Sequence, residues 1–132
     1  MNPKMSELYV DCHDAEIIGL SWDVTSLHLK LVDYQNIRKT FVLKGLISLR
    51  IRDLISYNIV GDNELLPPAV ASEGFWKFLL ADCPNAELFD KERTRLLDSL
   101  EGGGFAVFFS GSCGASLAAL CSEVEWRNDR GD

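Results

Sequence analysis

The sequence predicts an α+β domain that is mainly antiparallel β, a meander-like sheet with one or two helices inserted before the last two strands. Apolar and polar residues alternate in short runs within residues 15–60 and 105–126, as they do in half-buried strands. Short connections join these runs, which favours antiparallel pairing over parallel crossovers. Residues 66–101 show helical spacing after two prolines. We therefore expect residues 1–132 to form a single domain with a helical insertion.

The first half of the chain contains the clearest strand patterns. The expected strands cover residues 15–22, 27–32, 38–43, 47–52 and 57–60. Gly19 marks a candidate bulge in the first of them. The second places three leucines on one face and His28 and Lys30 on the other. The fourth is apolar on one face and cationic on the other, which is typical of a sheet with one covered face.

The second half adds helices and closes the sheet. The expected elements are a short helix after Ser72, a helix over 86–100, a strand over 105–109, a turn over 110–114 and a strand over 116–126. Ser72 is placed to cap the first helix with its hydroxyl group. The longer helix has its apolar residues on one face. Gly102 supplies its C-terminal stop.

The charge balance restricts the class of partner. Acidic residues outnumber basic ones, and the net charge is -7. Such a charge keeps a small protein soluble and attracts basic partners. It disfavours nucleic acid, which requires a clustered basic surface, and an anionic membrane surface for the same reason. The start of the sequence has no apolar signal region, and no apolar run approaches the ~20 residues that span a bilayer. A cytoplasmic protein is expected.

The cysteines do not predict a metal centre. Cys12, Cys83, Cys113 and Cys121 include no pair with the C-x-x-C spacing, so neither a zinc site nor any other cofactor is expected. The densest group of potential ligands is residues 12–16. In an extended segment His13 points away from its neighbours. We expect His13 or Asp14 to hydrogen-bond the backbone at the strand entry, and we keep His13, Asp14 and Glu16 as candidate binding residues.

Two segments resemble catalytic motifs only superficially. Residues 110–114 have Ser110 where the nucleophile elbow requires glycine, and they join two expected strands rather than a strand and a helix. Residues 102–104 are three glycines that follow a helix and precede a strand, the reverse of a phosphate-binding loop. Without a plausible nucleophile and base, the protein is not expected to be an enzyme.

An aromatic group in the helical insertion allows two interpretations. Phe75 and Trp76 lie close together in the short helix that follows Ser72. As exposed side chains they would be candidate anchors for a protein partner. As buried side chains they would pack the insertion onto the sheet, which is the usual role of an apolar helix face.

Several segments together resemble immunity-protein family fifty of bacterial polymorphic toxin systems and related bacterial proteins. They are residues 13–17, 41–51, 58–60 and 121–125. The resemblance covers the first half of the chain and the last strand, and residues 66–100 lie outside it as an insertion. It implies a mainly β domain without enzymatic activity, which neutralises a toxin by binding it.

Two functions from different classes follow. The first is a non-catalytic binding protein, with a basic toxin domain as its partner, toward which the acidic chain would be steered. The alternative is a small-ligand-binding domain, in which a curved sheet covered by a helix leaves an apolar pocket. Phe105, Phe108 and Phe109 are the candidate lining residues of that pocket.

Overall fold

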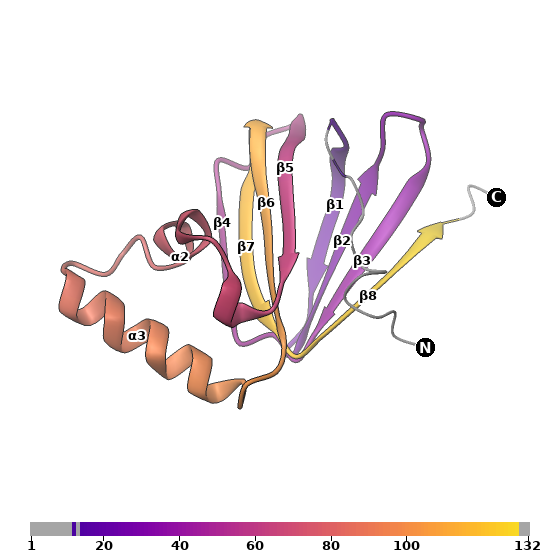
Figure 1. Ribbon diagram of the computed structural model, residues 1–132. Coiled ribbons are helices and arrows are strands. Elements are labelled where there is room, and N and C mark those ends of the chain that lie inside the picture. The colour runs from indigo at the N-terminus through magenta and orange to yellow at the C-terminus, as the bar shows by residue number, and fades with distance from the viewer. Residues whose placement is uncertain (1–11, 13, 130–132) are drawn as a thin grey trace.

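The computed structural model describes Cys12 and residues 14–129, and these form a mainly antiparallel α+β fold, as predicted (Figure 1). Within this range, eight strands make one sheet in the order β4-β7-β6-β5-β1-β2-β3-β8. The strands are β1 (Glu16–Trp22), β2 (Ser26–Val32), β3 (Arg38–Lys44), β4 (Ser48–Arg52), β5 (Asn58–Leu66), β6 (Phe105–Cys113), β7 (Ser116–Cys121) and β8 (Glu123–Asp129). A 3-10 turn η1 (Pro68–Val70) and the helices α2 (Glu73–Leu79) and α3 (Ala86–Ser99) lie between β5 and β6.

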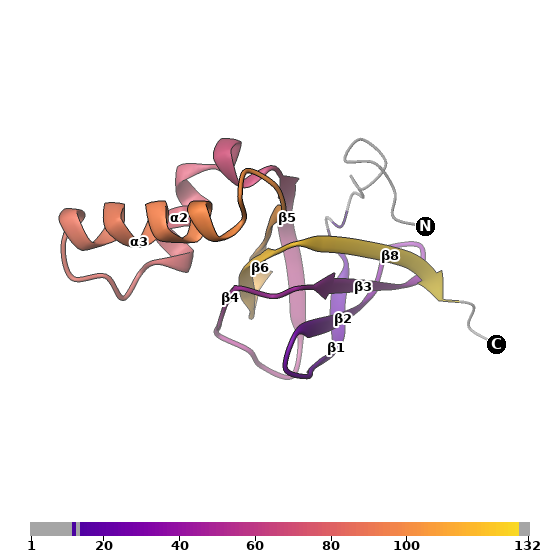
Figure 2. The ribbon, with the colours of Figure 1, turned by 90° about the horizontal axis from the view of Figure 1, so that it is seen from below.

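The sheet bends sharply where β3 passes into β4 and β7 passes into β8. At this corner the Ser122 N–H donates to the carbonyl oxygens of Lys44 at 3.0 Å and Gly45 at 3.2 Å, so pairing continues through the bend. Gly45 has a φ of +63°, and a Cβ there would lie 2.0 Å from the Ser122 Oγ, so this close approach requires glycine. Figures 1 and 2 show two groups of strands that converge at this end of the molecule.

The main core lies between the two halves of the sheet. It is formed by inward residues of β2 and β3 on one side and of β5, β6 and β7 on the other. Phe41 and Phe109 meet across it in an edge-to-face contact, with ring centroids 5.7 Å apart. Because side chains alternate along a strand, the leucines of β2 all point into this core, as the sequence predicts.

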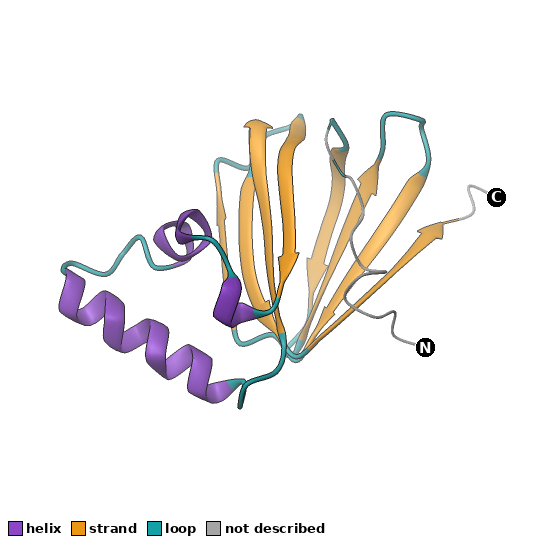
Figure 3. Ribbon diagram, in the orientation of Figure 1, coloured by secondary structure: helices purple, strands orange, loops and turns teal. Residues whose placement is uncertain are grey.

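The helices cover the other face of β4, β6 and β7, as Figure 3 shows. Ser72 caps α2 through its hydroxyl, which accepts a hydrogen bond from the Phe75 N–H at 3.1 Å. Phe75 and Trp76 are buried in a second apolar cluster with Ala118 and Leu120 of β7. No helix in the described part of the chain is long and apolar enough to cross a membrane.

Four details differ from the expectation. The predicted final strand is divided at Ser122 into β7 and β8, so the helices precede three strands rather than two. In one continuous strand Cys121 and Val124 would point to opposite faces. Because the chain bends at the corner, both side chains face the main core. Strand β6 continues to Cys113, where a turn was expected over residues 110–114, and β5 is nine residues long rather than a short strand.

Candidate functional site

The candidate site lies along β1, which is paired unequally on its two sides. Strand β1 pairs with β2 from Glu16 to Trp22, with a bulge between Ile17 and Gly19. Its pairing with β5 consists of Glu16 with Ile59 and Ile17 with Asn58. Beyond Ile17 the edge that faces β5 therefore has no strand beside it among the described residues.

The hydrogen-bond pattern identifies which backbone groups point to this open edge. The Asp23 N–H donates to the Ser26 carbonyl at 3.0 Å and so points toward β2. Successive residues of an extended strand present their backbone groups to opposite sides. Leu20 and Trp22 therefore direct their N–H and C=O groups away from β2. In the part of the chain that the structure describes, no hydrogen bond reaches these groups from the far side.

The turn after β1 fixes the end of the strand. The Asp23 carboxylate accepts hydrogen bonds from the N–H groups of Thr25 and Ser26, both at 3.0 Å. The two bonds lower the pKa of Asp23 below its ordinary value, and the bond from Thr25 has the larger effect. A charged, hydrogen-bonded aspartate therefore stabilises the β1–β2 turn at neutral pH.

A groove of about 490 Å³ runs between this edge and the β4–β5 loop, residues 53–57. Its lining residues are Glu16, Ile17, Ile18, Gly19, Leu20, Trp22, Leu54, Ile55, Ser56 and Asn58. The volume is within the range of sites that bind ligands or peptide side chains. One wall is a strand edge and the other is a loop.

Large apolar side chains are exposed on and around both walls. Ile18 is 42 % exposed and Trp22 is 65 % exposed, and Leu54 and Ile55 lie between these values. Single exposed apolar residues are ordinary, but a contiguous group on a small protein indicates an interaction surface. Trp is also among the residue types that most often dominate protein interfaces.

Asn58 holds the loop wall in place. Its buried side-chain oxygen accepts hydrogen bonds from the N–H groups of Ile55 at 3.0 Å and Ala115 at 2.9 Å. Its amide nitrogen donates to the Ile55 carbonyl at 2.6 Å. Gly114 makes room for this contact, because a Cβ there would lie 2.3 Å from the Asn58 Oδ1. One side chain thus joins the β4–β5 loop to the β6–β7 turn.

The groove carries one negative charge. Among the described residues that line it, Glu16 is the only charged side chain. Within the described part of the chain its carboxylate has neither a hydrogen bond nor an ion pair. The site therefore combines apolar side chains, free backbone groups and an unpaired carboxylate.

The predicted site residues fall in different places. His13 lies outside the described residues. Asp14 is exposed at a φ of +65°, and its N–H donates to the Val60 carbonyl at 2.9 Å. Glu16 lines the groove. Phe75 and Trp76 are buried against the sheet, so the packing interpretation describes them, and the candidate site does not include them.

Sequence reasoning missed the residues that form most of the groove, above all Trp22, Leu54 and Ile55. A signal was present for Leu54 and Ile55, which follow the end of the alternating run of β4, whereas Trp22 is the last residue of an expected strand. Apolar residues in a predicted turn or loop are candidates for exposure, because such segments lie on the surface.

The described residues do not assemble a metal centre, and the buried Cys121 thiol is not reactive. They contain no group of three or more His, Cys, Asp or Glu side chains that could hold a metal ion. Burial raises the pKa of Cys121 to about 12, so this thiol stays protonated and unreactive at neutral pH. Cys113 is exposed and donates weakly to the Tyr57 carbonyl at 3.8 Å.

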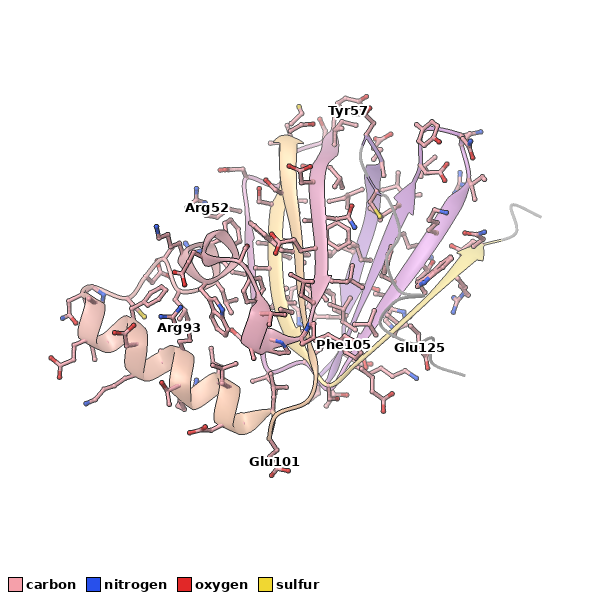
Figure 4. All side chains as sticks on the ribbon, in the orientation of Figure 1. Arg52, Tyr57, Arg93, Glu101, Phe105 and Glu125 are labelled. Carbon is pink, nitrogen blue, oxygen red and sulfur yellow. The ribbon has the colours of Figure 1, made fainter. Side chains whose placement is uncertain are left out.

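The three phenylalanines of β6 do not line one pocket. Phe108 packs against Phe75 and Phe78 of α2, whereas Phe109 contacts Phe41 in the main core. Phe105, labelled in Figure 4, belongs to the main core with Phe109.

Comparison of the chain with protein-family models, curated proteins and solved structures gives no match.

Proposed function

We propose that this chain is a non-catalytic protein-binding domain that acts as a bacterial immunity protein, neutralising a basic toxin by binding it through the groove beside β1. The single observation that supports binding most strongly is the grouping of the exposed side chains of Ile18, Trp22, Leu54 and Ile55 around one groove. Burying such a group against a partner would remove apolar surface from water.

The charge of the chain supports a basic partner. The net charge is -7, and the groove contributes the unpaired carboxylate of Glu16. Opposite charge on the partner would accelerate association at low ionic strength and favour one orientation. The toxin-neutralising role is supported by the resemblance of residues 13–17, 41–51, 58–60 and 121–125 to an immunity-protein family.

The experiment begins with capture of a partner from cells of the source organism, with the whole tagged chain as bait. Wild type and two variants, Trp22→Ala and Tyr34→Ala, are compared. Tyr34 is an exposed aromatic residue of the β2–β3 turn, outside the groove. We expect one dominant basic protein that Trp22→Ala retains poorly and Tyr34→Ala retains normally.

A second step tests neutralisation. The captured protein is expressed in a susceptible host with and without this chain, and growth is measured. Arrest without the chain and growth with it would support the proposal. A captured protein that is harmless alone would overturn the toxin-neutralising role. Equal retention by both variants would overturn the groove as the binding surface.

A small apolar ligand is the second candidate occupant, because the groove volume of about 490 Å³ suits one. Native mass spectrometry of the chain purified from its source organism separates the two occupants. A bound small molecule that is released by Trp22→Ala would favour the alternative over a protein partner.

A further inference from the structure

We propose that the groove binds an extended segment of a basic protein by strand addition, with the segment pairing to the open edge of β1 at Leu20 and Trp22. This inference rests on the proposed function and specifies how the partner is held. The added segment would lie between β1 and the β4–β5 loop.

The backbone of β1 supplies the main-chain part of the site. Leu20 and Trp22 each direct one donor and one acceptor to the open edge, where the described residues offer them no partner. An extended peptide can bond to both residues at once, because its own groups repeat with the same spacing. A globular surface without a free strand edge cannot match this pattern.

The open part of β1 also lacks the protection that other sheet edges carry. The edge strand β8 contains Glu123, Glu125, Arg127 and Asp129, and charges of this kind discourage pairing with another chain. The edge strand β4 is only five residues long and includes Arg50 and Arg52. By contrast, the segment from Leu20 to Trp22 has neither a charge nor a proline.

The side chains around the edge define the chemistry of the segment. Alternate residues of an added strand would lie beside Leu20 and Trp22, on the same face of the sheet, and apolar side chains suit those positions. Leu54 and Ile55 form the opposite wall and favour further apolar contact. At the end nearest β5, the unpaired Glu16 carboxylate favours a Lys or Arg side chain. The expected segment is therefore apolar at alternate positions and basic at one end.

The test uses a displayed library of random heptapeptides, selected against the whole chain. The best peptide is then synthesised in three forms: unmodified, N-methylated at the odd residues, and N-methylated at the even residues. N-methylation removes a backbone donor and leaves the side chain unchanged. In a paired strand only one of these two sets faces β1.

We expect enriched peptides with alternating apolar residues and a basic residue. One methylated form should bind at least about tenfold more weakly than the unmodified peptide, and the other within about threefold, as expected for the loss of main-chain hydrogen bonds. The amides of Leu20 and Trp22 should become protected from hydrogen exchange in the complex.

Two variants of the chain provide the reciprocal test. Leu20→Pro removes the free donor, and Leu20→Ala removes the same side chain but keeps the donor; circular dichroism confirms the fold of each. Peptide affinity should fall at least about tenfold further for proline than for alanine. Strand addition would be overturned if the selected peptides bound the Leu20→Pro chain as well as the wild-type chain. It would also be overturned if both methylated peptides bound equally well. If a captured toxin still depends on Trp22 in that case, the proposed function stands without this mode.

Discussion

Replacing Asn58 with alanine removes three hydrogen bonds that join the β4–β5 loop to the β6–β7 turn. The Ala115 N–H is buried, and a buried donor left without a partner costs about 1–3 kcal/mol. Ile55 is exposed, so water can replace the two bonds that its backbone loses. Together these two bonds contribute about 1 kcal/mol to the free energy of unfolding. The expected loss in the free energy of unfolding is therefore about 3 kcal/mol.

Urea denaturation followed by far-UV circular dichroism measures this loss. Thr40→Val is the comparison, because Thr40 is also buried but makes one side-chain hydrogen bond, to the Asp129 carboxylate at 2.6 Å. It should cost less than Asn58→Ala, about 1–2 kcal/mol. Amide exchange at Ile55 should accelerate in the Asn58 variant alone. A loss below about 1 kcal/mol, or unchanged exchange at Ile55, would refute the role assigned to Asn58.

Three further predictions concern stability. Gly114→Ala should cost several kcal/mol more than Gly102→Ala in thermal or urea unfolding, because both have a φ near +80° but only at Gly114 would the new Cβ meet Asn58 at 2.3 Å; equal costs would contradict this contact. Cys121 keeps its proton up to a pH of about 12 when folded, whereas an unperturbed thiol loses it near 9.0. The free energy of unfolding should therefore be unaffected below pH 9 and fall by about 1.4 kcal/mol per pH unit between these values, and Cys121→Ala should lack this part of the decline. Trp22→Ala should change the free energy of unfolding by less than about 0.5 kcal/mol, because Trp22 is 65 % exposed; a loss of 2 kcal/mol would assign it to the core.

Alternation predicted the sheet because most strands have one face in the core. The leucines of β2 are buried in the main core, Leu49 and Ile51 of β4 pack against it, and Ser72 follows the local rule for a helix cap. The glycine at position 19 predicts a bulge, and the register with β2 does shift between Ile17 and Gly19. Local patterns suffice where the chain is regular.

The corner and the groove depend on contacts between distant segments, which a local pattern does not record. Ser122 reaches Lys44 and Gly45 from 77 or more positions away, and this contact divides the last strand and shifts its alternation. The groove exists because β1 and β5 pair over two residues and then separate. Nothing in the apolar pattern of β1 alone specifies where that separation begins.

The exposure of Trp22 illustrates the same limit. Trp22 lies opposite the fully buried Leu27 on β2, and therefore on the core side of the sheet. It is exposed because β5 does not cover this end of β1. The exposure of Trp22 therefore depends on the tertiary arrangement, which the apolar pattern of β1 does not record.

The most direct test of the groove as a binding surface is the affinity of the captured partner, measured by isothermal titration calorimetry for wild type, Trp22→Ala and Tyr34→Ala. Removing an aromatic anchor at the centre of an interface costs about 2 kcal/mol or more, so Trp22→Ala should weaken binding by about 30-fold or more. Tyr34→Ala should remain within about twofold of wild type. Equal affinities of all three proteins would contradict the central claim.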